Sequence, residues 1–132
     1  MKIMLDTNIC IYIINRRPAA VLERFRSFRV GDIGISTITL AELEYGAAKS
    51  AQPRRNREAL VQFVSPLEVA AFDPPATAAY GTIRAALEKR GLRIGALDML
   101  IAAHALSLHA ALATNNKREF ERVPGLKLEN WL

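Results

Sequence analysis

The chain has 132 residues, of which 51% are hydrophobic, so it can bury a core and is not an intrinsically disordered chain. Its formal net charge of +5 favours an anionic partner such as nucleic acid, and its single cysteine excludes an internal disulfide. No apolar run reaches the roughly 20 residues of a membrane-spanning helix and no signal-peptide pattern opens the chain, so we expect a cytoplasmic protein without a membrane partner.

Short apolar strands alternate with helices along the chain. In chain order the pattern predicts a strand over residues 2–5, helices over 8–15 and 19–28, a strand over 31–35, helices over 37–50 and 53–64, a strand over 67–72, helices over 74–90 and 96–109, a strand over 110–113, a helix over 117–123 and an edge strand in the tail 126–132. This alternation is typical of an α/β fold with a mainly parallel central sheet. No linker divides the chain, so we expect residues 1–132 to form a single domain.

Two of the predicted strands end in the same kind of polar segment. Residues 3–8 read IMLDTN and residues 111–116 read ALATNN, an apolar strand followed by small polar side chains in each case. Ligands of open parallel sheets bind beyond the carboxyl ends of the strands. If these two strands are neighbours, Asp6 and Asn116 face the same crevice. The local alternative is that Asp6 only caps the following helix.

Glu42 and Glu44 are competing candidates within the segment STITLAELEYGA. Both lie beside apolar arcs of the predicted helix, so helical periodicity does not separate them. Glu42 lies nearer the start of the helix and therefore nearer the strand ends. A purely structural alternative exists for Glu42, because Thr39 precedes it with the spacing of a capping box.

Asp98 lies in the first turn of the most apolar helix of the chain, where the helix dipole favours a carboxylate. Its apolar neighbours imply partial desolvation, so it needs hydrogen-bond donors or a cation. Glu119 lies in the charged segment TNNKREFERV, where a solvated helix face is the local alternative to a functional role.

The acidic candidates gain weight as a group. If Asp6, Glu42 and Asp98 meet within ~4 Å of a common point, each like-charge pair costs roughly 4 kcal/mol at an effective dielectric of about 20. Such a cluster needs a cation, and all-oxygen ligands suit Mg²⁺ or Mn²⁺. Two histidines and one cysteine without ligand spacing argue against a zinc site.

Four blocks of the sequence, taken in order and spacing, resemble the VapC-type PIN-domain ribonucleases of toxin–antitoxin pairs. These blocks are MLDTN, ISTITLAELEYGA, GLRIGALDMLIAAHA and LATNNKREFERVPGL, which together span nearly the whole chain. The resemblance implies a Rossmann-like α/β fold with a small helical protrusion, and a Mg²⁺- or Mn²⁺-dependent endoribonuclease. It implies that Asp6, Glu42 and Asp98 hold the metal, and that the small polar residues Thr7 and Asn8 follow the first acid and contact substrate.

The chain departs from this family at one position. Many members have an aspartate where this sequence has Asn116. Glu119, one turn further on, can supply the missing charge or hold a metal-bound water, and Asn116 can ligate through its amide oxygen or orient substrate. With three firm carboxylates, we expect one tightly held metal rather than two.

The resemblance also implies a substrate and partners. Related proteins cut structured RNA including tRNA, with initiator tRNA as the substrate in the branch that this chain resembles, and thereby inhibit translation. Lys117 and Arg118 flank the predicted site and are our candidates for RNA contact. The implied partners are a VapB-type antitoxin and a second copy of the chain, assembled into a larger hetero-oligomer. We expect the antitoxin groove on the helices of residues 8–28 and 36–64.

Three other classes of protein share part of this sequence pattern. A haloacid-dehalogenase-type phosphatase needs a second aspartate two residues after the first, and Asn8 stands at that position. A receiver domain needs an acidic pair near the first strand and a lysine after a late strand, and neither is clear. A non-catalytic RNA-binding or scaffolding α/β domain explains the basic surface but gives Asp6, Glu42 and Asp98 no common purpose.

Overall fold

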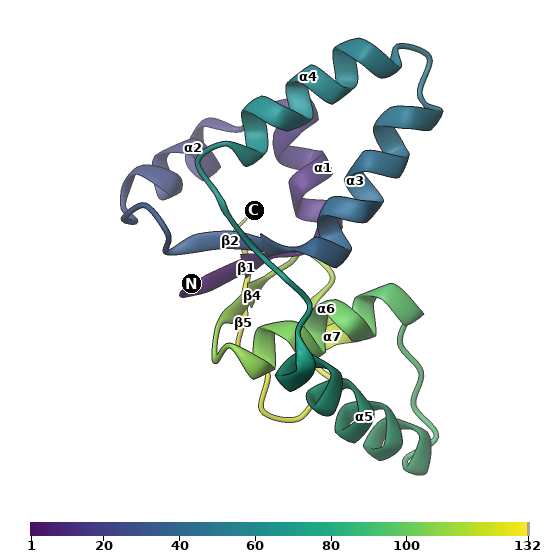
Figure 1. The fold of residues 1–132 in the computed structure, drawn as a ribbon. Coiled ribbons are helices and arrows are strands. Elements are labelled where there is room, and N and C mark those ends of the chain that lie inside the picture. The colour runs from purple at the N-terminus through teal and green to yellow at the C-terminus, as the bar shows by residue number, and fades with distance from the viewer. Residues whose placement is uncertain (132) are drawn as a thin grey trace.

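A five-stranded parallel sheet organises the computed structural model, which describes residues 1–131 (Figure 1). The strands are β1 (Ile3–Leu5), β2 (Ile33–Ser36), β3 (Glu68–Ala70), β4 (Ala111–Ala113) and β5 (Leu128–Glu129). The helices are α1 (Thr7–Arg16), α2 (Ala19–Arg26), α3 (Thr37–Lys49), α4 (Pro53–Val64), α5 (Pro74–Lys89), α6 (Ala96–Ser107) and α7 (Lys117–Phe120). The predicted α/β class is confirmed, and every strand pairing is parallel.

The strand order places the start of the chain at the centre of the sheet. The order is β3-β2-β1-β4-β5, so the chain extends in one direction from β1 through β2 to β3 and returns on the other side with β4 and β5. The sheet therefore has its topological switch point between β1 and β4, where ligands of such folds bind. These two strands pair in register, with Ile3 opposite Ala111 and Leu5 opposite Ala113.

Two helical layers cover the sheet, as Figure 1 shows with α1 to α4 above the strands and α5 to α7 below them. The side chains of β1 alternate between these layers, as a strand requires. Ile3 and Leu5 pack in the cluster with α1 to α4, and Met4 packs in the cluster with α5 to α7. Cys10 is fully buried in the first cluster. No helix of residues 1–131 is long and apolar enough to cross a bilayer.

The elements follow the predicted order, and their differences are at the ends. α7 covers Lys117–Phe120, whereas a helix to residue 123 was expected. The tail does add an edge strand, but β5 comprises only Leu128–Glu129. Ser36 is the N-cap of α3, since its hydroxyl accepts a hydrogen bond from the amide of Ile38 at 3.0 Å.

Candidate active site

Asp6 directly follows β1 and lies at the switch point. One of its carboxylate oxygens accepts the amide of Ile9 at 2.8 Å, which caps α1, and the other accepts the hydroxyl of Thr114, which directly follows β4. Burial raises the pKa of Asp6, the hydrogen bonds from Thr114 and Ile9 lower it, and the charge of Glu42 raises it. Asp6 is therefore a helix cap and a crevice carboxylate at once, so the two hypotheses were not alternatives.

Glu42 faces the same crevice from α3. Its carboxylate accepts the hydroxyl of Thr7 at 2.6 Å, one residue after Asp6. The hydroxyl of Thr39, which is fully buried, lies 3.2 Å from that of Thr7. The capping-box interpretation of Glu42 is wrong, because Ser36 and not Thr39 is the N-cap.

Glu44 points to a different partner. It forms an ion pair with Arg57 of α4, with the guanidinium Nε 3.1 Å from a carboxylate oxygen. The choice of Glu42 over Glu44 for the crevice therefore follows from contacts on two sides of α3. Glu44 ties the α3–α4 hairpin together, whereas Glu42 lies beside Thr7 and Asp6.

Asp98, in the first turn of α6, completes the group. Its pKa is raised to about 6, first by burial and then by the charges of Glu119, Asp6 and Glu42. Its carboxylate makes no hydrogen bond or ion pair with any side chain or amide of residues 1–131. The charges of Glu119, Asp6 and Glu42 thus act on Asp98 from three other segments, and no donor among residues 1–131 compensates them.

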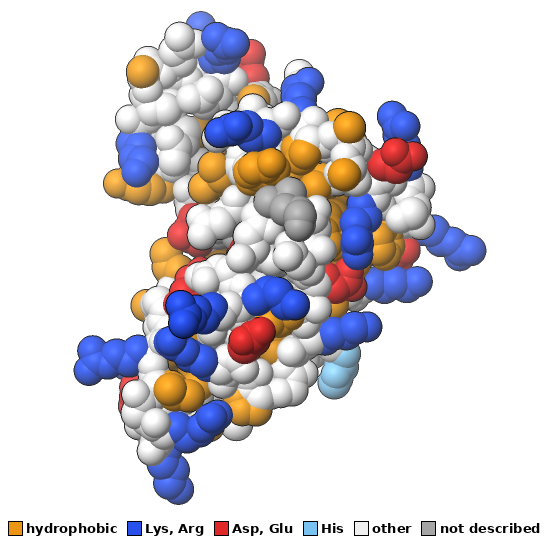
Figure 2. All heavy atoms as spheres, turned by 180° about the vertical axis from the view of Figure 1, so that it is seen from behind, with side chains coloured by type: hydrophobic (Ala, Val, Ile, Leu, Met, Phe, Trp, Pro, Cys, Tyr) orange, Lys and Arg blue, Asp and Glu red, His pale blue; other side chains and the backbone are white. Residues whose placement is uncertain are grey.

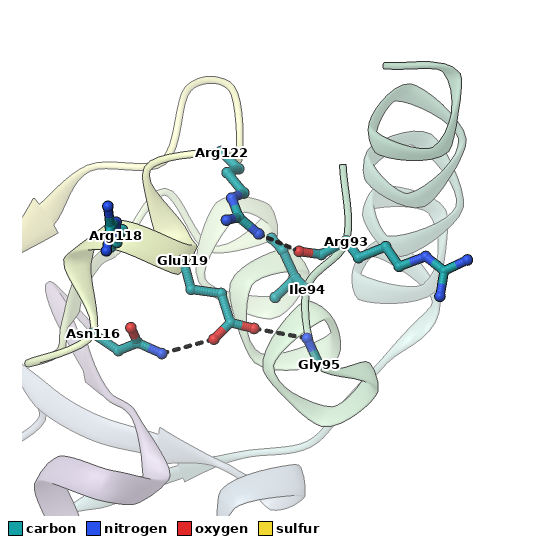
Figure 3. A pocket seen from close by; sticks show the side chains of 7 residues that line it. All are labelled: Arg93, Ile94, Gly95, Asn116, Arg118, Glu119 and Arg122. Atoms are coloured by element: carbon teal, nitrogen blue, oxygen red, sulfur yellow. Dashed lines mark hydrogen bonds between the residues drawn. The ribbon is translucent and has the colours of Figure 1, made fainter. Parts of the chain in front are cut away.

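Glu119 is held in place by two hydrogen bonds (Figure 3). One oxygen accepts the amide of Gly95 at 2.7 Å, and the other accepts the side-chain amide of Asn116 at 2.7 Å. The local alternative of a solvated helix face does not describe Glu119, because both of its carboxylate oxygens accept hydrogen bonds from other segments. A Cβ atom on Gly95 would lie 3.4 Å from Asp98 Oδ2 and 3.7 Å from Glu119 Oε1, so Gly95 lies between these two carboxylates.

The donor set fits a hard divalent cation. The four carboxylates supply only oxygen ligands, and no lysine, arginine or histidine of residues 1–131 forms an ion pair with any of them. Within the same residues, no three acidic, histidine or cysteine side chains already stand at metal-ligand spacing. The hydrogen bonds from Thr7, Thr114 and Asn116 orient three of the acids, and a cation between them would offset their repulsion.

The chain matches one protein family over almost its whole length. Residues 3–126 match the model of the PIN domain, which covers almost the whole chain including Asp6, Glu42, Asp98 and Glu119. The chain belongs to the PIN-domain family. It is a VapC-type member, since it is 48% identical over 131 residues to the tRNA(fMet)-specific endonuclease VapC of Shigella flexneri, covering 99% of this chain and 98% of that protein. It is also 48% identical to ribonuclease VapC2 of Haemophilus influenzae, covering 100% and 99% of the two chains.

Two solved structures similar to this PIN domain are DNA-bound VapBC complexes. The matching chain of DNA-bound VapBC from Salmonella typhimurium has a TM-score of 0.97 at 45% identity, covering 100% of this chain and 99% of that chain. VapBC2 from Rickettsia felis, bound to a DNA fragment from its promoter, has a TM-score of 0.93 at 46% identity and covers 100% of both chains.

The remaining predicted site residues of this PIN domain lie around the crevice. Thr7 is buried, and its hydroxyl holds Glu42. Asn8, Lys117 and Arg118 are exposed, Asn8 on α1 and the two basic residues on α7. The side-chain amide of Asn116 donates to Glu119, a contact that was not among the roles predicted for it, which were metal ligation and substrate orientation.

Two residues near the acids were missed from the sequence. Thr114 takes the place after β4 that Asp6 takes after β1, so the matching segments MLDTN and LATNN carried a usable signal. Gly95 carried no such signal, because its contacts with Asp98 and Glu119 depend on how the α5–α6 loop meets α7.

His104 links the two helices that carry Glu42 and Asp98. It is fully buried on α6, and its Nδ1 lies 2.8 Å from the hydroxyl of Ser36, the N-cap of α3. Burial lowers the pKa of His104, which favours the neutral ring. This contact fixes the start of α3 against α6, so the two helices that carry Glu42 and Asp98 are held relative to each other.

Proposed function

We propose that this chain is the toxin of a VapBC pair, a Mg²⁺- or Mn²⁺-dependent endoribonuclease that hydrolyses tRNA and thereby inhibits translation. The names of the two relatives at 48% identity support the ribonuclease activity, and that of the Shigella flexneri protein supports initiator tRNA as substrate. The observation that carries the metal dependence is the unpartnered carboxylate of Asp98 beside Glu119, Asp6 and Glu42.

In this proposal Asp6, Glu42 and Asp98 hold one metal ion through their carboxylate oxygens. When bound, the ion supplies Lewis-acid activation of water and neutralises charge on the phosphate. Thr114 and Thr7 orient Asp6 and Glu42 through their hydroxyl groups. Such orienting contacts determine how well ligands are placed, and their loss typically costs 10–100-fold in metal affinity or activity.

Glu119 is the fourth acid of the proposed mechanism. Hydrogen bonds from Asn116 and Gly95 hold the carboxylate of Glu119, and Gly95 is also next to the carboxylate of Asp98. We assign Asn116 the role of a positioning residue, which replaces the direct ligand that an aspartate would provide. Because Asn116 places a neutral amide where an aspartate would add a fifth carboxylate, one tightly held ion balances the negative charge of the crevice better than two.

The substrate contacts come from residues at the rim of the crevice. Lys117 and Arg118 of α7 are exposed beside Glu119, and Asn8 is exposed beside Asp6 and Thr7. The cations Lys117 and Arg118 offset the repulsion between RNA phosphates and the acidic group, and Asn8 offers an uncharged amide to the substrate. Figure 2 shows that basic side chains outnumber acidic ones over the lower half of the rear face, which favours approach of RNA from solvent.

The experiment incubates the purified chain with total tRNA, with and without Mn²⁺, and maps the cut ends. We expect cleavage only with the metal, and a loss of about 100-fold or more in Asp98→Asn, because that variant lacks one cation-binding charge. Glu44→Gln is the matched control, since Glu44 neutralises Arg57 on another face of α3.

Undiminished cleavage by Asp98→Asn would remove Asp98 from the mechanism. Tight RNA binding without cut ends under all metal conditions would favour the non-catalytic RNA-binding domain instead. A thermal shift with Mn²⁺ that disappears in Asp6→Asn separates these outcomes, because a scaffolding domain gives the acids no cation to bind.

The antitoxin in this proposal occupies an apolar groove between α1, α2 and α4. The groove has a volume of about 510 Å³ and is lined largely by the apolar residues Ile13, Ile14, Leu22, Phe25, Phe28, Val30, Phe63 and Leu67. Val30 is 95% exposed and Leu22 is 40% exposed, so an apolar partner segment is needed to cover them. These residues support the expected placement on the helices of residues 8–28 and 36–64.

A second copy of the chain is the other proposed protein partner. Three large apolar side chains, Ile11, Tyr45 and Leu97, are exposed by 43%, 65% and 45% around one hollow next to Glu42. Burial of this face in a homodimer would bring two acidic crevices near each other. The larger hetero-oligomer then consists of this dimer with antitoxin chains in both grooves.

A further inference from the structure

A second hollow lies against the acidic crevice on the side of α7. It has a volume of about 420 Å³ and is lined by Arg93, Ile94, Gly95, Asn116, Arg118, Glu119 and Arg122. Figure 3 shows Arg118 and Arg122 on either side of Glu119, with the guanidinium of Arg122 directed into the hollow. Apart from Arg118, the proposed function has not assigned any role to its basic residues.

The guanidinium groups of this hollow are not neutralised by carboxylates. No ion pair within residues 1–131 involves Arg93, Arg118 or Arg122. Glu119 is the only acid of the lining, and its two oxygens accept hydrogen bonds from Gly95 and Asn116 instead. The hollow therefore keeps a net positive charge that an anion can neutralise.

One hydrogen bond holds the guanidinium of Arg122 in place, and no other hydrogen bond or ion pair within residues 1–131 uses its remaining N–H donors. Its Nη1 donates to the backbone carbonyl of Arg93 at 2.6 Å, which anchors the guanidinium over the hollow. A guanidinium has five N–H donors, so a fork remains for a second acceptor. An arginine anchored in this way loses less conformational entropy on binding than a free surface side chain.

The hollow and the acidic crevice share a wall. Glu119 and Gly95 line the hollow. A Cβ atom added to Gly95 would lie 3.4 Å from Asp98 Oδ2, so the hollow reaches the side of the crevice where Asp98 lies. An RNA strand whose phosphodiester lies at the four acids therefore has a neighbouring phosphate within reach of the hollow. Phosphate suits it better than a base, because its lining offers two guanidiniums and no aromatic ring on which a base could stack.

We propose that Arg118 and Arg122 form a subsite for the backbone phosphate that neighbours the phosphodiester to be cut. The subsite rests on the proposed ribonuclease function and adds a positioning element to it. By fixing the adjacent phosphate it aligns the reacting one with the acids, which contributes to rate through orientation. Because every nucleotide has this phosphate, the subsite acts on any sequence.

Arg93 provides a matched control within the same hollow. Its backbone carbonyl accepts from Arg122, but its guanidinium points away from the hollow (Figure 3). Arg93→Gln therefore removes the same charge as Arg122→Gln from nearly the same place without removing a phosphate ligand. General attraction of RNA to a basic surface predicts equal losses in the two variants, whereas a subsite predicts unequal ones.

The experiment first maps the cut site of the wild-type chain on tRNA with Mn²⁺, and then uses a short RNA that contains this site. We expect Arg118→Gln and Arg122→Gln each to lower kcat/KM about 10-fold, the usual size for one charge-assisted hydrogen-bonding group. Arg93→Gln should stay within about twofold of wild type. Arg122→Lys should lose less than Arg122→Gln, because it keeps the charge but not the fork.

A modified substrate tests the identity of the ligand. A single neutral methylphosphonate is placed at the linkage on either side of the cut. One of the two positions should lower wild-type kcat/KM about 10-fold and cause no further loss in Arg122→Gln, since both changes remove the same contact. Thermal denaturation and RNA binding in EDTA are measured for each variant, so that a misfolded variant is recognised. If Arg122→Gln misfolds, Arg122→Lys takes its place.

The outcomes separate the two proposals. Equal losses in all three arginine variants, or additive losses with methylphosphonate, would overturn the subsite while wild-type cleavage upholds the ribonuclease. Unchanged RNA cleavage with lost antitoxin binding would assign the arginines to an acidic protein segment and also overturn it. No cleavage by the wild-type chain would refute the proposed function, and the subsite with it.

Discussion

Asp98 is the carboxylate of the crevice that no donor among residues 1–131 stabilises. Asp6, Glu42 and Glu119 accept hydrogen bonds from Thr114, Thr7 and Asn116. Asp98 instead meets the negative charges of the other three, and with burial they raise its pKa to about 6. At the scale of single residues, hydrogen-bond donors within residues 1–131 stabilise three of the acids but not the fourth.

The raised pKa of Asp98 makes a prediction for the metal-free chain. The folded state binds this proton more tightly than the unfolded state, whose pKa is near 3.8, so its stabilising contribution is lost as the pH rises through about 6. Asp98→Asn has no such proton and should have a melting temperature a few degrees above wild type at pH 7 in EDTA. The difference should be smaller at pH 5, where wild-type Asp98 is largely protonated.

Differential scanning fluorimetry of both chains at pH 5 and pH 7 in EDTA measures this effect. Glu44→Gln is the comparison, because it removes an exposed ion pair with Arg57 and no crevice charge. A melting temperature of Asp98→Asn below that of wild type at pH 7 would mean that Asp98 is stabilised in the folded chain, contrary to the crevice described above.

At the scale of elements, the helices on one face of the sheet leave an apolar groove open. α1, α2 and α4 contribute apolar residues to it, but no element within residues 1–131 covers it. A partly open hydrophobic groove between helices is a common site for an amphipathic helix of a partner. The groove and the acidic crevice have separate linings, so partner binding and catalysis can be disturbed independently.

Leu22→Asp should therefore abolish co-purification with the VapB-type antitoxin while leaving tRNA cleavage within about twofold of wild type. Leu22 is 40% exposed on the rim of the groove, so a charge there opposes an apolar partner without entering the core. Val61→Asp is the control, since Val61 is 58% exposed on α4 and does not line the groove. Retained antitoxin binding by Leu22→Asp would move the docking site elsewhere.

The whole molecule presents a second uncovered apolar face beside the crevice. Ile11 of α1, Tyr45 of α3 and Leu97 of α6 come from three elements but meet around a single hollow. Exposed apolar groups gathered in this way are typical of an interface between proteins. Because the face adjoins Glu42 and Thr7, association of two copies would shape the entrance to the active site as well.

Light scattering after gel filtration tests this face. The wild-type chain should have twice the monomer mass of 14.6 kDa, and Tyr45→Glu should shift towards that monomer mass. Tyr45 is 65% exposed, so the substitution should leave the fold intact. Val61→Asp again serves as the control and should remain dimeric. A wild-type chain that elutes as a monomer would contradict the homodimer.

The order and type of the elements were predictable from the sequence, because they depend on neighbours in the chain. The alternation of apolar strands and helices along the chain predicted the elements close to their observed bounds. Asp6 and Asp98 were also identifiable locally, as acids after a buried strand and in the first turn of an apolar helix. The similar segments after β1 and β4 raised the condition that these strands are neighbours, and the structure pairs them.

Only the tertiary structure decided what each polar side chain contacts. Thr114 reaches Asp6 across 108 positions of sequence, Glu42 reaches Thr7 across 35, and Glu119 reaches Gly95 across 24. Each of these hydrogen bonds depends on how separate elements cross at the sheet edge, which no local periodicity encodes. Helical periodicity alone did not separate Glu42 from Glu44 for this reason. Local patterns determined the elements of this protein, and long-range packing determined the contacts of its acids.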